Sequence, residues 1–201
     1  GGERARNIKR HGLRVRGLVD LDTPCQVVAQ AEAFTCGELL GFADKTDHMD
    51  HALAELSSLQ PEGVFSVANG IMKNDQLAAT YGPEKILGCM ANFSGELLDN
   101  GIVEFTRNVC VFIGPTPGYS GPEAITIANV VDSAGVHAKA TDRIAVVEWS
   151  KFAGWVALFS LSLLARTNTG TFLDNGSFAS LGVSLITVSY THLTLPTNRE
   201  V

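Results

Sequence analysis

The chain has 201 residues, of which 45% are hydrophobic and 18% are charged, which is enough apolar sequence for a folded core. Its formal net charge of -6 argues against a general nucleic-acid or anionic-membrane binder. The longest apolar stretch, residues 152–164, is too short to span a bilayer. The cysteines form no CxxC pair, which predicts reduced, buried thiols in a cytoplasmic protein. The four cysteines are Cys25, Cys36, Cys89 and Cys110.

Apolar runs and turn residues predict the elements of the N-terminal half. The first helix is expected to end before Gly12, because glycine readily adopts the conformation that terminates helices. A second helix has its apolar residues at helical spacing, with Thr46 or Asp47 as its N-cap. The expected elements are helices over residues 3–11, 47–59 and 75–81, and strands over residues 13–19, 26–29, 39–43 and 63–68.

The C-terminal half continues this alternation. Asp99-Asn100-Gly101 is a turn signal, and the strands that follow it, over residues 102–106 and 109–113, suggest antiparallel pairing. Before residue 142, the succession of strands and helices implies a mostly parallel α/β sheet. The expected elements are strands over residues 86–91, 102–106, 109–113 and 136–140, a loop over 114–122, and helices over 124–134 and 143–166.

Both ends of the chain differ from those of an ordinary open reading frame. The sequence does not begin with Met, and residues 188–197 resemble a translated sequencing adapter. We therefore treat residues 188–201 as a non-native tail, expect them to form no coherent element, and exclude them from the predicted fold. The alternative is a natural β-rich tail.

Three segments carry polar residues in a fixed order. Lys45 follows one predicted strand, Asn69-Gly70 follows the next, and Lys151 lies inside the long apolar helix. In order and approximate spacing, this set resembles the ketopantoate reductase (2-dehydropantoate 2-reductase) family over roughly residues 3–175. The resemblance implies a reductase that uses NADPH to reduce a 2-oxo acid, most simply 2-dehydropantoate to pantoate in pantothenate biosynthesis.

The resemblance also implies a domain organisation. Residues 1–142 would be a partial NADP-binding Rossmann domain, and residues 143–187 would begin an all-helical substrate domain. No two glycines are separated by a single residue, so the chain has no GxGxxG loop to approach a pyrophosphate. In the family this loop belongs to the first strand and helix, which would lie upstream of Gly1. The chain would then be a fragment of a longer protein.

Each residue of the set has an implied role and an alternative. Lys151 would be the catalytic general acid, because an ammonium can polarise a ketone oxygen and donate its proton. The alternative is a lysine that reaches from the helix to water. Asn69 would bind the substrate or the nicotinamide ribose, or would serve only as a turn residue. Lys45 and the backbone of Ser94 would lie beside the cofactor, although Lys45 could also be a solvated loop residue.

A basic cluster near the N-terminus suits the 2′-phosphate of NADP. Dinucleotide folds often place an arginine after the second strand for this purpose. Arg4 is the implied cofactor-binding member, and the alternative is a solvated helix face. The cluster consists of Arg4, Arg6, Lys9, Arg10, Arg14 and Arg16.

The chain departs from the family where substrate is held. The family carries Asn one and two turns after the helix lysine, whereas this chain has Trp155 and Phe159. Asn168 would supply one substrate-binding amide, although it does not fall at either of the two positions where the family carries Asn. These changes make the pocket more apolar and favour a bulkier or different oxo acid.

Other functions remain open. The alternatives are another hydroxyacid or opine-type dehydrogenase and a relative that binds a dinucleotide or metabolite without catalysis. We expect no nucleic-acid or membrane partner and no metal site, because the acids among residues 47–51 are explained by the helix macrodipole. Homodimerisation of a full-length parent is left open.

Overall fold

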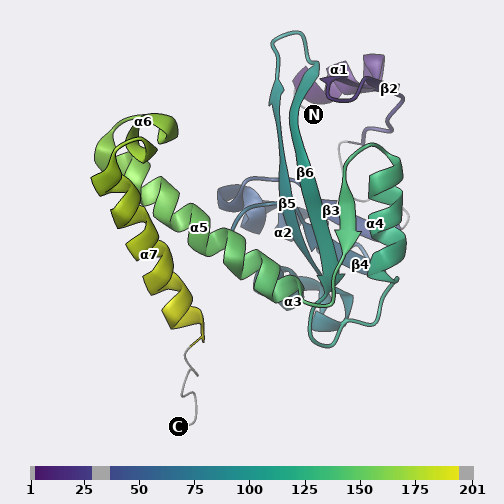
Figure 1. Ribbon diagram of the computed structural model, residues 1–201. Coiled ribbons are helices and arrows are strands. Elements are labelled where there is room, and N and C mark those ends of the chain that lie inside the picture. The colour runs from purple at the N-terminus through teal and green to yellow at the C-terminus, as the bar shows by residue number, and fades with distance from the viewer. Residues whose placement is uncertain (1–2, 29–36, 195–201) are drawn as a thin grey trace. The chain divides into compact units, whose positions relative to one another are not determined.

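The computed structural model describes residues 3–28 and 37–194 (Figure 1). The chain divides into two compact units, Gly1–Ile144 and Ala145–Val201, which we call the first and second units. The first unit is an α/β structure and the second unit is helical. The helix expected at the N-terminus is confirmed as α1 (Glu3–His11), and Gly12 follows it with φ of 72°.

A mixed sheet forms the larger part of the first unit. Its strands are β1 (Leu13–Gly17), β2 (Leu21–Thr23), β5 (Leu87–Leu97), β6 (Val103–Pro115) and β7 (Ala138–Ala140). The order is β2-β1-β6-β5, and β7 also pairs with β6. β1 and β7 run parallel to β6, whereas β5 runs antiparallel to it and β2 antiparallel to β1. The expected mostly parallel sheet is therefore an α/β sheet of mixed direction.

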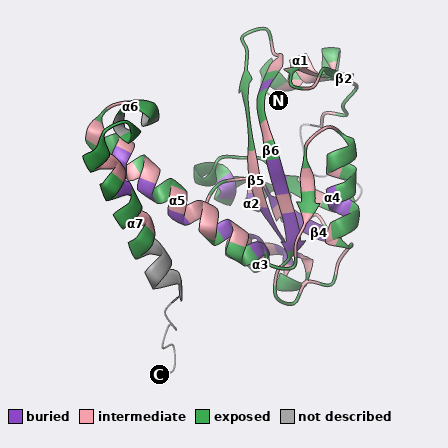
Figure 2. Cartoon of the chain, in the orientation of Figure 1, coloured by how far each residue is buried: buried purple, intermediate pink, exposed green. Residues whose placement is uncertain are grey.

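The β5–β6 hairpin is the element that differs most from expectation. The two strands expected over residues 102–106 and 109–113 do not pair with each other: both fall in one strand, β6, which begins at Val103 and pairs antiparallel with β5. The turn closes through a bond from the Ile102 N–H to the Asn100 side-chain oxygen at 3.0 Å, as the turn signal predicted. Figure 2 shows that the buried residues of both strands gather at the end away from this turn.

Two parallel strands, β3 (Leu39–Phe42) and β4 (Gly63–Ser66), lie beside the start of β5. A parallel bridge between Val64 and Ile86 joins them to the main sheet. The helical turn η2 (Thr46–His48) and helix α2 (Met49–Leu56) follow β3, and α3 (Lys73–Tyr81) and η3 (Pro83–Lys85) follow β4. Apolar side chains from these elements form one core cluster: Phe42, Met49, Leu53, Val64, Leu77, Tyr81 and Ile86.

A second core lies between the main sheet and α4 (Ala124–Ser133). Its buried members are Leu87, Cys89, Val111, Ile113 and Ile127. Tyr119 packs against this cluster and donates a hydrogen bond to the Pro122 carbonyl oxygen at 2.6 Å. Cys89 and Cys110 are buried as expected, whereas Cys25 is exposed, which the prediction of buried thiols did not anticipate. Cys36 lies outside the described residues.

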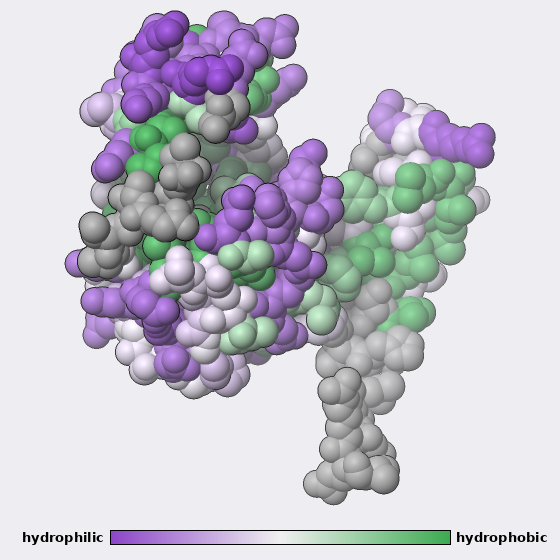
Figure 3. All heavy atoms as spheres, turned by 180° about the vertical axis from the view of Figure 1, so that it is seen from behind, coloured by the Kyte–Doolittle hydropathy of each residue, from purple (hydrophilic) through white to green (hydrophobic). Residues whose placement is uncertain are grey.

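The second unit contains α5 (Ile144–Ala165), which begins at the boundary, α6 (Thr169–Leu173) and α7 (Gly176–Thr194). Leu161 of α5 packs against Gly182 of α7. Apolar side chains are exposed on these helices, as Figure 3 shows. By length and composition alone, α5, with 22 residues, could cross a membrane, although core helices of soluble proteins pass the same test. The apolar stretch at residues 152–164 lies inside this helix, which agrees with the helix expected over residues 143–166.

Three further expectations need correction. Neither Thr46 nor Asp47 caps α2: His48 occupies the N-cap without a side-chain bond, because the Thr46 hydroxyl bonds elsewhere. Residues 26–28 form no strand, and residue 29 lies outside the described residues. Residues 188–194 continue helix α7, so this part of the tail does form an element. Residues 195–201 lie outside the described residues.

Candidate functional site

The loops that follow β3 and β4 meet at one edge of the sheet. The two strands are parallel, so their carboxyl ends lie together, and open α/β sheets bind ligands at this edge. The Thr46 hydroxyl donates a hydrogen bond to the Asn69 carbonyl oxygen at 3.0 Å, and the Val67 N–H bonds the Phe42 carbonyl at 3.0 Å. The structure therefore joins the loop of Lys45 to the loop of Asn69.

The Asn69-Gly70 turn has open space at its apex. Gly70 has φ of 101°, a conformation that favours glycine. A Cβ atom at Gly70 would meet no atom within 4 Å, so the turn is restricted by its backbone conformation and not by crowding. At the strand end, the Ser66 hydroxyl accepts a bond from the Ala68 N–H at 3.1 Å. Asn69 is exposed at this turn.

Lys45 lies at the same edge and is exposed. Its backbone is extended, with φ of -69° and ψ of 151°, and its carbonyl oxygen accepts the first bond of η2 from the His48 N–H at 2.9 Å. An exposed ammonium at this edge can bind the hydroxyl, phosphate or carboxylate oxygens of a ligand.

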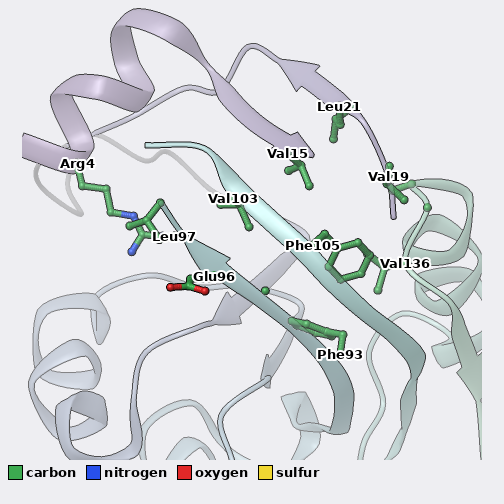
Figure 4. A pocket seen from close by; sticks show the side chains of 13 residues that line it. Arg4, Val15, Val19, Leu21, Phe93, Glu96, Leu97, Val103, Phe105 and Val136 are labelled. Atoms are coloured by element: carbon green, nitrogen blue, oxygen red, sulfur yellow. The ribbon is translucent and has the colours of Figure 1, made fainter. Parts of the chain in front are cut away.

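Arg4 and the neighbours of Ser94 surround a separate pocket of about 370 Å³ (Figure 4). Arg4 lies at one end of this pocket, and Phe93 and Phe105 lie at the other, with ring centroids 6.4 Å apart. The walls are mainly apolar. Phe93 and Gly95 line the pocket, whereas Ser94 between them is not among the lining residues.

Ser94 lies in an irregular part of the β5–β6 ladder. The register shifts between Asn92 and Phe93 and again between Ser94 and Gly95. The Ser94 carbonyl oxygen accepts a hydrogen bond from the Thr106 hydroxyl at 3.3 Å. Bulges of this kind often re-aim side chains near binding sites.

Two members of the basic cluster hold the β1–β2 region together. Arg16 forms two bonds to the Asp22 carboxylate, at 2.7 and 2.9 Å, and Arg14 donates to the Asn100 carbonyl oxygen at 2.8 Å. The hydrogen bond from Arg16 lowers the pKa of Asp22, and the same bond raises the pKa of Arg16. The exposed basic side chains of α1 give that end of the molecule the hydrophilic surface in Figure 3.

Lys151 of α5 shares a helix face with two aromatic residues. Trp155 and Phe159 follow it at intervals of four residues and stack with ring centroids 5.0 Å apart. Lys151 is half-buried, whereas Trp155 and Phe159 are 39% and 57% exposed. The buried face of α5, with Ala153, Ala157 and Leu161, lies on its other side. The aromatic pair is thus presented beside Lys151 and does not form part of the buried face.

Asn168 has a structural use in the second unit. Its side-chain oxygen accepts bonds from the Thr171 N–H and the Thr171 hydroxyl, each at 2.9 Å, at the start of α6. Asn175 acts in the same way at the start of α7, bonding the Ser177 and Phe178 N–H groups. A substrate role for Asn168 remains a prediction, and its oxygen is already engaged.

Sequence patterns did not identify two buried charged residues. Lys73, the first residue of α3, is 2% exposed, and Glu148 of α5 is 8% exposed. Glu148 lies three residues before Lys151, a spacing at which helix side chains are neighbours. Within the described residues, no group of three or more His, Cys, Asp or Glu side chains could hold a metal ion.

Two comparisons concern proteins named for ketopantoate chemistry. A 2-dehydropantoate 2-reductase of Archaeoglobus fulgidus is 26% identical over 166 residues, which cover 83% of this chain and 55% of that protein. The structure of 2-dehydropantoate 2-reductase from Geobacter metallireducens has 19% identity and a TM-score of 0.83, covering 95% of this chain and 65% of that one. This chain therefore spans between about half and two thirds of the length of these relatives.

A third comparison concerns a related oxidoreductase. The ternary structure of D-mandelate dehydrogenase with NADH and anilino(oxo)acetate has 18% identity and a TM-score of 0.66, covering 94% of this chain and 69% of that one. At these identities, the solved structures establish the α/β fold alone. The family model of ketopantoate reductase PanE/ApbA matches residues 1–118, which is more than half of the chain. The chain belongs to the ketopantoate reductase PanE/ApbA family.

Proposed function

We propose that this chain carries part of the active site of an NADPH-dependent 2-oxo acid reductase, with 2-dehydropantoate as the first substrate to test. The hydrogen bond between Thr46 and Asn69 carries the proposal, because it joins two polar loops at the carboxyl edge of parallel strands in a member of this family. Residues 1–142 serve the nucleotide, and residues 143–187 contribute to the substrate side.

The residues at this edge fit one end of a nicotinamide dinucleotide. Lys45 and Asn69 offer an ammonium and an amide for the ribose hydroxyls and the carboxamide, beside the open space at Gly70. Arg4 on α1 supplies positive charge for a 2′-phosphate, and Ser94 contributes its backbone. When bound, NADPH supplies the hydride that reduces the ketone. The 201 residues contain no GxGxxG loop, so the chain alone should bind the pyrophosphate weakly.

Lys151 supplies the proton in this proposal. As the ketone carbon accepts hydride, its oxygen becomes negative and takes a proton from the Lys151 ammonium. Asn69 holds either the substrate carbonyl or the nicotinamide ribose during this step.

A second candidate is reduction of an aromatic 2-oxo acid. The stacked Trp155 and Phe159 favour it, because they occupy the face of α5 that also carries Lys151. The related D-mandelate dehydrogenase structure holds anilino(oxo)acetate, an aromatic oxo acid. A third candidate, nucleotide binding without catalysis, follows if neither class of oxo acid is reduced. We further propose a cytoplasmic location.

The experiment uses a reading frame that contains this chain and extends to the length of its relatives. Purified protein is mixed with NADPH or NADH and with ketopantoate, pyruvate or phenylglyoxylate, and loss of the reduced nicotinamide absorbance is followed. We expect NADPH to be consumed only when an oxo acid is present. Tight NADPH binding without consumption by any of these acids would support the non-catalytic candidate.

A further inference from the structure

The buried polar side chains of the first unit lie on either side of the Asn69-Gly70 turn. Among the described residues of this unit, the buried polar or charged side chains are Ser66, 0% exposed, and Lys73, 2% exposed. Ser66 ends β4 just before the turn, and Lys73 begins α3 just after it. Lysine is almost never buried this deeply in proteins unless its ammonium is paired.

The position of Lys73 is unfavourable for a cation in two respects. Removing an ammonium from water carries a large desolvation cost. Lys73 is also the first residue of the nine-residue helix α3, where the helix macrodipole is positive and favours anions. An apolar side chain of similar length would avoid both costs. A lysine here therefore has a use that depends on its ammonium group.

The turn between β4 and α3 needs anchors at both of its ends. The space beside Gly70 is open, because a Cβ atom at this position would meet no atom within 4 Å. On the strand side, Thr46 bonds the Asn69 carbonyl at 3.0 Å, and Ser66 bonds the Ala68 N–H at 3.1 Å. On the helix side, α3 packs against β4 and α2, and the bond from Gln76 to Asp50 at 3.2 Å ties the two helices together.

We propose that Lys73 is a positioning residue whose buried ammonium fixes the helix side of this turn and so holds Asn69 at the sheet edge. The effect of Lys73 on reduction rests on the proposed function, in which Asn69 binds the substrate or the ribose. Its effect on the turn does not depend on that function. The two effects are tested separately.

The first test measures amide hydrogen exchange in the chain itself. Lys73→Met keeps the length and apolar stem of the side chain and removes the charge. We expect exchange in residues 67–72 to become about tenfold faster, while the β5–β6 strands keep their protection. Lys139→Met on β7 is the control, because Lys139 is exposed, and it should leave the turn unchanged. An unchanged turn, or a uniform rise across the first unit, would overturn the proposal.

A second variant keeps the test decisive if Lys73→Met does not fold. Lys73→Arg retains the positive charge, and the turn should keep its protection to within about threefold. Lys73→Gln retains hydrogen bonding without the charge, and here the turn should exchange faster. Equal exchange in Lys73→Arg and Lys73→Gln would contradict a role for the cation.

The third test is a double-mutant cycle in the longer, active protein. If Lys73 acts through Asn69, Lys73→Met lowers kcat/KM about tenfold in the wild type but less than about twofold in an Asn69→Ala background. Fully additive effects would contradict positioning through Asn69. If Asn69→Ala alone leaves kcat/KM unchanged, the proposed role of Asn69 fails, and the exchange result still decides whether Lys73 holds the turn.

Discussion

The Thr46 hydroxyl donates a hydrogen bond to the carbonyl oxygen of Asn69 at 3.0 Å, across the ends of two parallel strands. A threonine just before a helix usually caps it, but this hydroxyl instead crosses to the neighbouring loop. Helix α2 starts at Met49, and its N-cap residue, His48, makes no side-chain capping bond. The position of the Asn69 loop relative to Lys45 thus depends in part on one hydroxyl group.

The first prediction concerns this bond. Thr46→Val preserves the shape of the side chain and removes the donor, so the free energy of unfolding should fall by about 1 kcal/mol. Nucleotide affinity of the longer protein should fall as well, because the two loops are no longer joined. Denaturant unfolding and calorimetry measure the two effects.

Thr126→Val is the matched control for this prediction. Thr126 is exposed on α4, away from both loops, so its replacement should change neither quantity beyond error. If Thr46→Val behaves like Thr126→Val in both measurements, the bond contributes nothing to the site.

The local elements of this fold were predictable from sequence, whereas their pairing was less so. Gly12 identified the end of α1, because glycine adopts positive φ without strain. The direction of β5 against β6 depends on contacts between distant residues, so a local pattern could not establish that residues 103–106 and 109–113 lie in a single strand. The reach of Thr46 to Asn69 is likewise a tertiary effect that overrides a local capping preference.

The second prediction concerns the pH dependence of the Arg16–Asp22 pair. The bond from Arg16 lowers the pKa of Asp22 below its ordinary value of 3.8. The pair therefore stabilises the folded state above about pH 4, and this contribution is lost as pH falls through the lowered pKa. Asp22→Asn should therefore reduce the melting temperature at neutral pH and leave it unchanged at about pH 2. The reduction should be small, because both side chains of the pair are exposed and solvent screens their charges.

The measurement is the melting temperature of wild type and of Asp22→Asn at a series of pH values from neutral to about pH 2. Asp20→Asn is the comparison variant, because Asp20 acts on Arg16 through its charge alone, so its effect should be smaller than that of Asp22→Asn. A difference between wild type and Asp22→Asn that persists unchanged at the lowest pH would show that the effect is not electrostatic.

The third prediction concerns Tyr119. Burial raises the pKa of Tyr119 to about 12 from an ordinary value of 10.0. The folded state thus keeps the phenol proton where the unfolded state loses it, so stability falls as pH rises from about 10 to about 12. Tyr119→Phe should remove this part of the loss of stability at alkaline pH. At neutral pH it should lower the free energy of unfolding by about 1 kcal/mol, since the hydrogen bond to the Pro122 carbonyl is lost. Spectroscopic titration of tyrosinate measures the pKa, and titration of Tyr119 near 10 would contradict burial.

The fourth prediction concerns substrate preference. Trp155→Asn replaces one ring of the stacked pair with an amide. In the longer protein it should shift the ratio of kcat/KM toward ketopantoate over phenylglyoxylate by about tenfold, because an apolar contact is exchanged for a hydrogen-bonding group. Trp149→Asn on the same helix is the control, since Trp149 packs with Phe152 and not with Phe159. An equal shift in both variants would show that Trp155 has no particular role.

The candidate site was only partly predictable from sequence. The sequence placed Lys45 and Asn69 after two neighbouring strands, and the structure joins their loops at one sheet edge through Thr46, while their roles remain a prediction. Sequence alone could not separate the two uses of Asn168, because asparagine suits both ligand binding and helix capping. In the structure its side-chain oxygen bonds Thr171 at the start of α6. The burial of Lys73 carries no sequence signal, since a lysine in a first helical turn is normally solvated.

The most direct test of a 2-oxo acid reductase is the turnover of Lys151→Ala in the longer protein. General acid catalysis typically contributes about a hundredfold to ten-thousandfold, so kcat for oxo-acid reduction should fall by about that factor. NADPH affinity should change little, because Lys151 acts where charge develops in the transition state. Lys139→Ala, an exposed lysine on β7, should retain wild-type turnover. Wild-type kcat in Lys151→Ala, on whichever oxo acid the protein prefers, would contradict the role proposed for this lysine.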